Sequence, residues 1–126
     1  MSVDRTIFRE YDIRGVYPSD LNEKSIEVIA DAISKKCFKE NIRSVVVGRD
    51  GRNSGQSLLK AFSDRLIKNG INVKNIGLVT SPILYFAAKK EVNKSGIMIT
   101  GSHNPKNYNG LKMILNDCLL YTSPSP

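Results

Sequence analysis

The sequence predicts an α/β fold: a three-layer α/β/α domain whose sheet is mixed but mainly parallel. Segments of strand type alternate with segments of helical periodicity along most of the chain, which favours this class. The strand segments are continuous apolar runs, as expected for strands that are covered on both faces. Ligands of open α/β sheets bind beyond the carboxyl ends of the strands, so the loops that follow the strands are the first candidates for a site.

Three helices are expected. The first follows Asn22, which can serve as its N-cap. Its apolar face consists of Ile26, Ile29, Ala30, Ile33 and Cys37. The second helix ends at Gly70, which suits the left-handed position just past a helix. Its apolar face consists of Leu58, Leu59, Phe62, Leu66 and Ile67. The third helix has Ser81 as its cap and Pro82 as its first residue, and it runs through Ala88.

Four strands are expected, at residues 44–47, 73–78, 95–100 and 111–115. The first three are separated by helices, which predicts parallel pairing. The last two are joined by about ten residues, too few for a helical crossover, so an antiparallel pair is expected there. Residues 1–20 are polar and are expected to be irregular.

The charge of the chain suggests an anionic partner. Its 126 residues include 19 Lys and Arg against 12 Asp and Glu, a formal net charge of +7. Nucleic acid, an acidic membrane surface and phosphorylated small molecules all fit this excess. The basic residues are dispersed, however, and a dispersed charge is also typical of an ordinary solvated surface.

Composition excludes several classes of protein. No apolar run approaches the eighteen or so residues of a membrane span, and residues 1–5 have no apolar signal core. Cys37 and Cys118 are too few for a disulfide scaffold, and their spacing matches no metal-ligand motif. These features favour a cytoplasmic protein.

Residues 118–126 differ from the rest of the chain, since they carry no charge and no periodicity. They resemble a translated reading frame of a sequencing-library adapter, and a natural Ser/Pro linker is the alternative. We therefore expect the domain to comprise residues 1–117, and the natural protein to continue beyond Asp117.

The most informative loop is the segment that follows the third expected strand. Gly101 permits a sharp turn and Pro105 fixes the backbone shortly after, so Ser102 lies on a constrained loop. A hydroxyl in this position can accept an acyl or phosphoryl group, and His103 and Lys112 can supply a proton acceptor and a cation. Composition alone also fits a simple turn. No G-x-S-x-G motif surrounds the serine, which disfavours a serine hydrolase.

Two further segments can bind an anion. Arg49 and Arg52 flank an Asp-Gly turn and could hold a phosphate, although they could equally pair with Asp50. The loop is not a P-loop, because the Lys-Ser/Thr ending is absent. Near the N-terminus, Tyr11 and Arg14 could contact an anion or simply pack on the domain.

Together these motifs resemble a known family. The order Tyr-Asp-Ile-Arg-Gly (11–15), Gly-Arg-Asp-Gly-Arg (48–52), Thr-Gly-Ser-His-Asn-Pro (100–105), Tyr-Asn-Gly (108–110) and Lys112 is similar to the first domain of the α-D-phosphohexomutases. The resemblance covers residues 5–115. The opening motif and the Tyr-Asn-Gly motif point to the phosphomannomutase/phosphoglucomutase branch.

The resemblance implies an intramolecular phosphotransferase that interconverts hexose 1-phosphate and hexose 6-phosphate. Ser102 would be the phosphoserine, passing through a hexose 1,6-bisphosphate, and its phosphate would ligate Mg²⁺. His103 and Lys112 would assist proton transfer and orient the phosphate, and Tyr11 and Arg14 would contact the substrate. The partner would be a phosphorylated hexose, with no nucleic acid and no membrane.

The family's metal loop, sugar-recognition segment and C-terminal phosphate-binding domain are absent from this sequence. The remaining Mg²⁺ ligands are therefore expected in a second domain, and this chain alone is expected to be inactive. A non-catalytic phosphate-binding module and a nucleic-acid-binding module are the alternatives. The sequence leaves open the preference for mannose or glucose phosphates and the oligomeric state.

Overall fold

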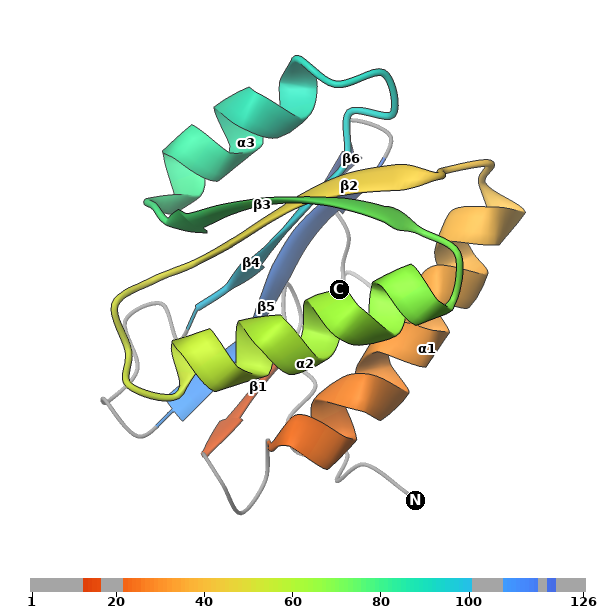
Figure 1. Cartoon of the computed structure of the whole chain (residues 1–126). Helices are drawn as coiled ribbons and strands as arrows, with labels where there is room; N and C mark the ends of the chain where they lie inside the picture. Colours follow the sequence, from red (N-terminus) through yellow and green to blue (C-terminus); the bar gives the residue numbers. More distant parts are fainter. Residues whose placement is uncertain (1–12, 17–21, 101–107, 116–117, 120–126) are drawn as a thin grey trace, which may run out of the picture.

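A computed structural model of the chain describes residues 13–16, 22–100, 108–115 and 118–119 (Figure 1). The elements in chain order are β1 (Ile13–Val16), α1 (Glu23–Lys39), β2 (Ser44–Arg49), α2 (Gly55–Lys68), β3 (Asn72–Leu78), α3 (Ser81–Lys89), β4 (Gly96–Ile99), β5 (Tyr108–Leu115) and β6 (Cys118–Leu119). None of the helices in these ranges is long and apolar enough to cross a membrane.

The strands form one mixed sheet in the order β1-β5-β4-β2-β3, with β6 also paired to β5. β2 is parallel to both β3 and β4. β5 is antiparallel to β4, β1 and β6. The predicted mixed sheet is confirmed, and so is the predicted antiparallel pairing of β4 and β5. These two strands flank residues 101–107, which are called the serine segment below.

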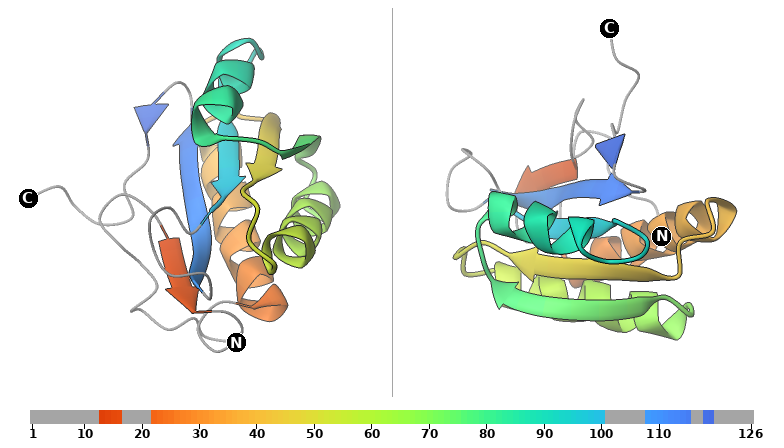
Figure 2. Two further views of the ribbon diagram at one scale, coloured as in Figure 1. Left: turned by 90° about the vertical axis from the view of Figure 1, so that its left-hand side faces the viewer. Right: turned by 90° about the horizontal axis from the view of Figure 1, so that it is seen from above.

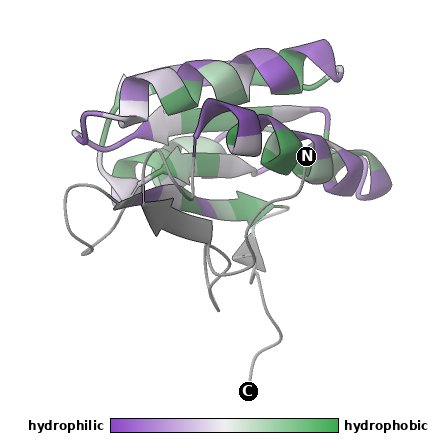
Figure 3. Ribbon diagram, turned by 90° about the horizontal axis from the view of Figure 1, so that it is seen from below, coloured by the Kyte–Doolittle hydropathy of each residue, from purple (hydrophilic) through white to green (hydrophobic). Residues whose placement is uncertain are grey.

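Helices cover the sheet on both faces, as Figures 1 and 2 show. The larger apolar cluster joins α1 and α2 to one face and includes Ile26, Phe62, Val47 and Ile97. The smaller cluster joins α3 to the other face through Leu84, which packs with Val46 and Met98. In Figure 3 the central strands are mainly hydrophobic, whereas hydrophilic residues cover large parts of the helices. The predicted three-layer α/β/α architecture is confirmed.

α1 begins as predicted. The Asn22 side chain accepts a hydrogen bond from the Ser25 amide at 2.9 Å, and the Ser25 hydroxyl accepts one from the Asn22 amide at 2.8 Å. This reciprocal pair satisfies two amides that the helix itself leaves unpaired. All five residues predicted for the apolar face are buried.

α2 agrees with the prediction except at one residue. Gly70 follows the helix with φ +97°, the left-handed conformation predicted for it. Ile67, however, is 57% exposed. It lies in the last turn of the helix, one residue before the helix ends at Lys68. Its assignment to the apolar face was wrong.

The cap of α3 is Thr80 rather than the predicted Ser81. The Thr80 hydroxyl accepts a hydrogen bond from the Ile83 amide at 3.4 Å, and the Thr80 carbonyl accepts one from the Leu84 amide at 3.0 Å. Ser81 is therefore the first helical residue and Pro82 the second. Pro82 is still tolerated in the first turn, because amides there need no intrahelical partner.

Several strand assignments also differ from the prediction. β5 begins at Tyr108 rather than at residue 111, and β6 was not expected. β1 lies within residues 1–20, which were expected to be irregular, and pairs antiparallel with β5. Its four residues include Arg14 and Gly15, so the sequence there has no apolar run that would indicate a strand. β2 continues through Gly48 and Arg49, because both still pair with β4.

β3 is the last strand in the sheet order and is largely exposed. Its pairing with β2 shifts between Val47 and Arg49. Nearby, Gly77 adopts φ +74°, and its amide donates to the Asn75 side-chain oxygen at 2.8 Å. The Lys74 ammonium lies 3.6 Å from the Glu91 carboxylate. The end of β3 therefore departs from a regular strand.

Candidate functional site

The predicted site residues are only partly within the described structure. Tyr11, Ser102 and His103 lie outside the described residues. Arg14 is in β1 and Lys112 is in β5. The arrangement around the serine segment is therefore defined by the residues at its two ends and by the strands next to them.

A backbone hydrogen bond joins the two ends of the serine segment. The chain leaves β4 at Thr100 and enters β5 at Tyr108. The Thr100 amide donates to the Gly110 carbonyl at 2.8 Å. The described residues on either side of residues 101–107 are therefore joined at the carboxyl edge of β4, the edge where the sequence predicted a site.

Strand register brings Arg14 and Lys112 toward the same place. Arg14 pairs with Gly110, the residue that accepts from Thr100. Lys112 is two residues farther along β5 and lies opposite Met98. Directly opposed residues share a face of the sheet, so Lys112 is on the α3 side. The structure thus groups both cationic positions with the ends of the serine segment.

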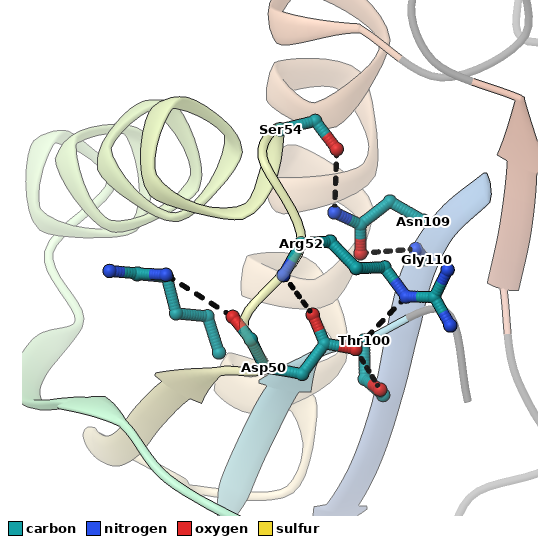
Figure 4. A network of polar contacts seen from close by, with 7 residues as sticks. Asp50, Arg52, Ser54, Thr100, Asn109 and Gly110 are labelled. Atoms are coloured by element: carbon teal, nitrogen blue, oxygen red, sulfur yellow. Dashed lines mark hydrogen bonds and ion pairs between the residues drawn. The ribbon is translucent and has the colours of Figure 1, made fainter. Parts of the chain in front are cut away.

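The Asp50 carboxylate holds the first end of the segment (Figure 4). One carboxylate oxygen accepts a hydrogen bond from the Thr100 hydroxyl at 2.7 Å and one from Arg52 Nε at 3.1 Å. The other oxygen accepts from the Arg52 amide at 3.2 Å. The Asp50 amide donates to the Ile99 carbonyl at 3.0 Å, which fixes the residue beside β4.

Asn109 holds the second end. Its side-chain amide donates to the Ser54 hydroxyl at 2.8 Å, and its side-chain oxygen accepts from the Gly110 amide at 2.9 Å. Asn109 is fully buried, so these partners replace water for both of its polar groups. The loop after β2 therefore contacts both ends of the serine segment, through Asp50 and through Ser54 (Figure 4).

The two arginines of the loop after β2 both contact Asp50 in the same loop. Arg52 pairs with Asp50, and Arg49 donates to the Asp50 carbonyl at 3.2 Å. These contacts agree with the interpretation in which both guanidinium groups hold the Asp-Gly turn. Arg52 is well placed to orient the Asp50 carboxylate toward Thr100.

An open cavity of about 510 Å³ lies beside this network, at the carboxyl ends of β2, β3 and β4. Asp50, Thr80 and Thr100 contribute polar groups to its wall, and Leu78 and Met98 contribute apolar surface. Residues that directly follow β2 and β4, and the end of β3 with the turn after it, thus line one cavity at this edge of the sheet.

Within the ranges the structure describes, no three His, Cys, Asp or Glu side chains are grouped as metal ligands. Asp50 is the acidic residue in the network, and its carboxylate is engaged by Thr100 and Arg52. The described residues therefore do not by themselves fit a Mg²⁺ site.

Sequence reasoning assigned no role to Thr100, Asn109 or Ser54, and treated Asp50 only as part of a turn. Two of these residues carry a usable signal, because Asp50 and Thr100 each follow directly after a buried strand. Their contact depends on β2 and β4 being neighbours, which the strand order along the chain does not reveal.

Comparison with known proteins identifies the family. Residues 5–124 match the model of the phosphoglucomutase/phosphomannomutase alpha/beta/alpha domain I. The chain belongs to this family. It is 47% identical to a phosphoglucomutase from Neisseria gonorrhoeae over 114 residues, which are 90% of this chain and 25% of that protein. It is 46% identical to a phosphomannomutase/phosphoglucomutase from Pseudomonas syringae over 110 residues, 87% of this chain and 24% of the relative.

A solved structure agrees with the assignment. The phosphoglucomutase/phosphomannomutase family protein from Burkholderia thailandensis superposes with a TM-score of 0.89 at 38% identity. The match covers 95% of this chain and 28% of that one. The chain thus spans about a quarter of the length of the relatives it matches. The division between residues 1–117 and 118–126 remains a prediction; β6, at the start of the second part, pairs with β5.

Proposed function

We propose that this chain supplies the phosphoserine-bearing domain of a cytoplasmic phosphomannomutase/phosphoglucomutase, with a phosphorylated hexose as its partner and neither nucleic acid nor membrane. The observation that carries the proposal is the hydrogen bond from the Thr100 amide to the Gly110 carbonyl, which joins the two ends of the serine segment. The strand positions of Arg14 and Lys112 lie next to it. Family membership supports the same reading. The chain alone is expected to be inactive, because it spans only a quarter of its relatives.

In the proposed reaction, a free hydroxyl of a hexose monophosphate attacks the phosphorus of phosphorylated Ser102. A new P–O bond forms to the sugar as the bond between phosphorus and the serine oxygen breaks; the sugar hydroxyl loses its proton, and the serine oxygen takes one up. In the second transfer the serine hydroxyl attacks the other phosphate of the hexose 1,6-bisphosphate and loses its proton, and the sugar oxygen that releases this phosphate gains one. The number of phosphates is conserved, and the product is the isomeric monophosphate.

The chain's own residues would act mainly by position and charge. Phosphoryl transfer requires little covalent chemistry from a protein, so orientation and charge stabilisation dominate. We assign proton transfer and phosphate orientation to His103 and Lys112, and substrate contact to Tyr11 and Arg14. Lys112 lies in the middle of a paired strand, which limits its backbone freedom.

Mg²⁺ would offset the charge of the phosphoserine, about −1.5 to −2 at neutral pH. The phosphate on Ser102 would be the ligand from this chain, and the other ligands would come from outside it, since the described residues offer no ligand cluster. The Mg²⁺ assignment rests on the resemblance, and no step above depends on the ion.

A chimera tests the proposal directly. Residues 5–115 of this chain replace the matching segment of the Neisseria gonorrhoeae phosphoglucomutase, and conversion of glucose 1-phosphate to glucose 6-phosphate is measured with glucose 1,6-bisphosphate as activator. We expect an active enzyme that carries one phosphate on Ser102 by mass spectrometry. The Ser102→Ala chimera is the matched control and is expected to lose both the phosphate and the activity.

Two outcomes contradict the proposal. One is a folded chimera that neither turns over substrate nor carries phosphate on Ser102. The other is a Ser102→Ala chimera that is as active as its parent. Unchanged sugar-phosphate binding in Ser102→Ala, with no phosphate found on the parent, favours a non-catalytic phosphate-binding module. Affinity for nucleic acid that falls steeply with salt favours the remaining alternative.

A further inference from the structure

We propose that the hydrogen bond between Asp50 and Thr100 positions the serine segment for phosphoryl transfer, so that both residues set the turnover rate without touching the substrate. The inference rests on the proposed function, because it gives these two side chains a part in that reaction. It concerns residues that the structure describes, at the point where the serine segment leaves β4.

The contact is close to the reacting group along the chain. Thr100 is two residues before Ser102, and its hydroxyl lies 2.7 Å from the Asp50 carboxylate. Thr100 is buried, so water competes little for this hydroxyl. A hydrogen bond to an ionised carboxylate is roughly twice as strong as one between neutral groups. The last residue before the serine turn is therefore held by both its amide and its side chain.

Asp50 is itself firmly held. Arg52 approaches both carboxylate oxygens, one through its amide and one through its side chain. The Asp50 amide is bonded to the Ile99 carbonyl on the neighbouring strand. The carboxylate thus serves as a fixed reference point that links the end of β2 to the end of β4.

The same loop also holds the far end of the segment. Ser54 accepts a hydrogen bond from the buried Asn109 at 2.8 Å. Asp50 and Ser54 are only four residues apart, so one short loop sets the separation of the two ends. A displacement of a reacting group by about 1 Å can reduce an enzymatic rate by about 100-fold, so contacts that fix the two ends of the segment can affect turnover.

The pair is tested in the chimera described above by changing only the hydroxyl. Thr100→Val removes the hydroxyl and keeps the shape, whereas Thr100→Ser keeps the hydroxyl. We expect Thr100→Val to lower kcat by about 10-fold to 100-fold, with KM for glucose 1-phosphate within about twofold of the parent. Thr100→Ser is expected to retain most of kcat.

Asp50→Asn completes a double-mutant cycle with Thr100→Val. If the two residues act through their hydrogen bond, the double variant loses much less kcat than the product of the two single losses. Asp31→Asn, which weakens a contact between α1 and α2 far from the segment, is the stability control. It should lower the unfolding midpoint and leave kcat unchanged at a temperature where the variant is folded.

A second measurement, amide hydrogen exchange, does not depend on enzymatic activity. In the unmodified 126-residue chain, the amide of residue 100 is bonded to Gly110, and its hydrogen exchange reports how firmly the segment ends are joined. We expect Thr100→Val to accelerate that exchange about tenfold and Thr100→Ser to change it little. Equal exchange and equal kcat in all three proteins would overturn the inference.

The two proposals fail in different ways. A folded parent chimera that is inactive and unphosphorylated contradicts the proposed function. An active parent whose Thr100→Val variant keeps both kcat and amide exchange contradicts the positioning role alone. Losses of kcat in Thr100→Val that merely follow the loss of folded protein, as in a destabilised control, also overturn it.

Discussion

The Asp31 carboxylate of α1 accepts two hydrogen bonds from the Arg65 guanidinium of α2, at 2.8 and 2.9 Å. Asn69 donates to the same carboxylate at 2.8 Å and to the Ser34 hydroxyl at 3.1 Å. These polar contacts join the two helices on their outer side, while the apolar faces of both helices pack against the sheet.

Acid should weaken this contact. The hydrogen bonds from Arg65, and then that from Asn69, lower the pKa of Asp31 from 3.8 to about 2. Since the folded-state pKa is the lower one, the stabilisation is present above about pH 4 and is lost as the pH falls through about 2. We expect Asp31→Asn to lower the unfolding midpoint at pH 7 and to have a much smaller effect at pH 2.

The control for that experiment is Asp64→Asn. Asp64 pairs with Lys60 within α2, at 2.8 Å on an exposed surface, and it joins no second element. We expect little change in its unfolding midpoint at either pH, because exposed pairs of this kind contribute little. Equal effects of Asp31→Asn and Asp64→Asn would contradict the proposed bridging of α1 and α2.

Removing the Phe62 ring should strongly destabilise the fold. Phe62 is fully buried between α2 and the sheet, and Phe→Ala in a core costs about 3–5 kcal/mol through lost burial and the cavity left behind. Phe86 is 62% exposed on α3, and Phe86→Ala should change the free energy of unfolding by about 0.5 kcal/mol or less. Urea unfolding of both variants checks the contrast.

Substitution by alanine should have different effects on stability at Gly48 and at Gly51. A Cβ at Gly48 would lie 2.8 Å from Val79 Cγ2 and 3.2 Å from the Gly77 carbonyl oxygen. We expect Gly48→Ala to destabilise the protein by about 1–3 kcal/mol through overpacking. At Gly51 the nearest atom would be Leu78 Cδ1 at 3.9 Å, so Gly51→Ala should be nearly neutral. Similar unfolding free energies for the two variants would refute this.

The Cys37 thiol should react slowly in the folded protein. Burial, and then the charge of Glu40, raise the pKa of Cys37 from 9.0 to about 11, which leaves little thiolate at pH 8. In a Cys118→Ser variant, we expect iodoacetamide to modify Cys37 at least about tenfold faster in urea than in buffer. Modification at equal rates would mean that the thiol is accessible in the native state.

Much of the fold was predictable because its signals are local. Five apolar residues at helical spacing placed α1, and Gly70 marked the end of α2. β1 was not predicted, because its four residues, which include Arg14 and Gly15, show no strand pattern of their own. The strand is defined by its pairing with β5, which is a tertiary contact. Ile67 was misassigned because a single apolar residue beside the buried stripe looks like part of it.

The candidate site was predictable at the level of motifs and not at the level of contacts. Ser102, His103, Lys112, Tyr11 and Arg14 were all selected by chemistry and by resemblance. The partnership of Asp50 with Thr100 requires that β2 and β4 be adjacent. That adjacency follows from the strand order in space, which a strand-by-strand reading of one sequence leaves undetermined.

The irregular end of β3 limits the ways in which two copies of the chain can join their sheets. An edge strand with regular, free amides invites a second molecule to extend the sheet and so favours aggregation. Here the Gly77 amide is already bonded to the Asn75 side chain, and the left-handed turn at Gly77 diverts the backbone. Lys74 adds a charge that an incoming strand would have to accommodate. The irregular end of β3 thus discourages intermolecular sheet growth along this edge.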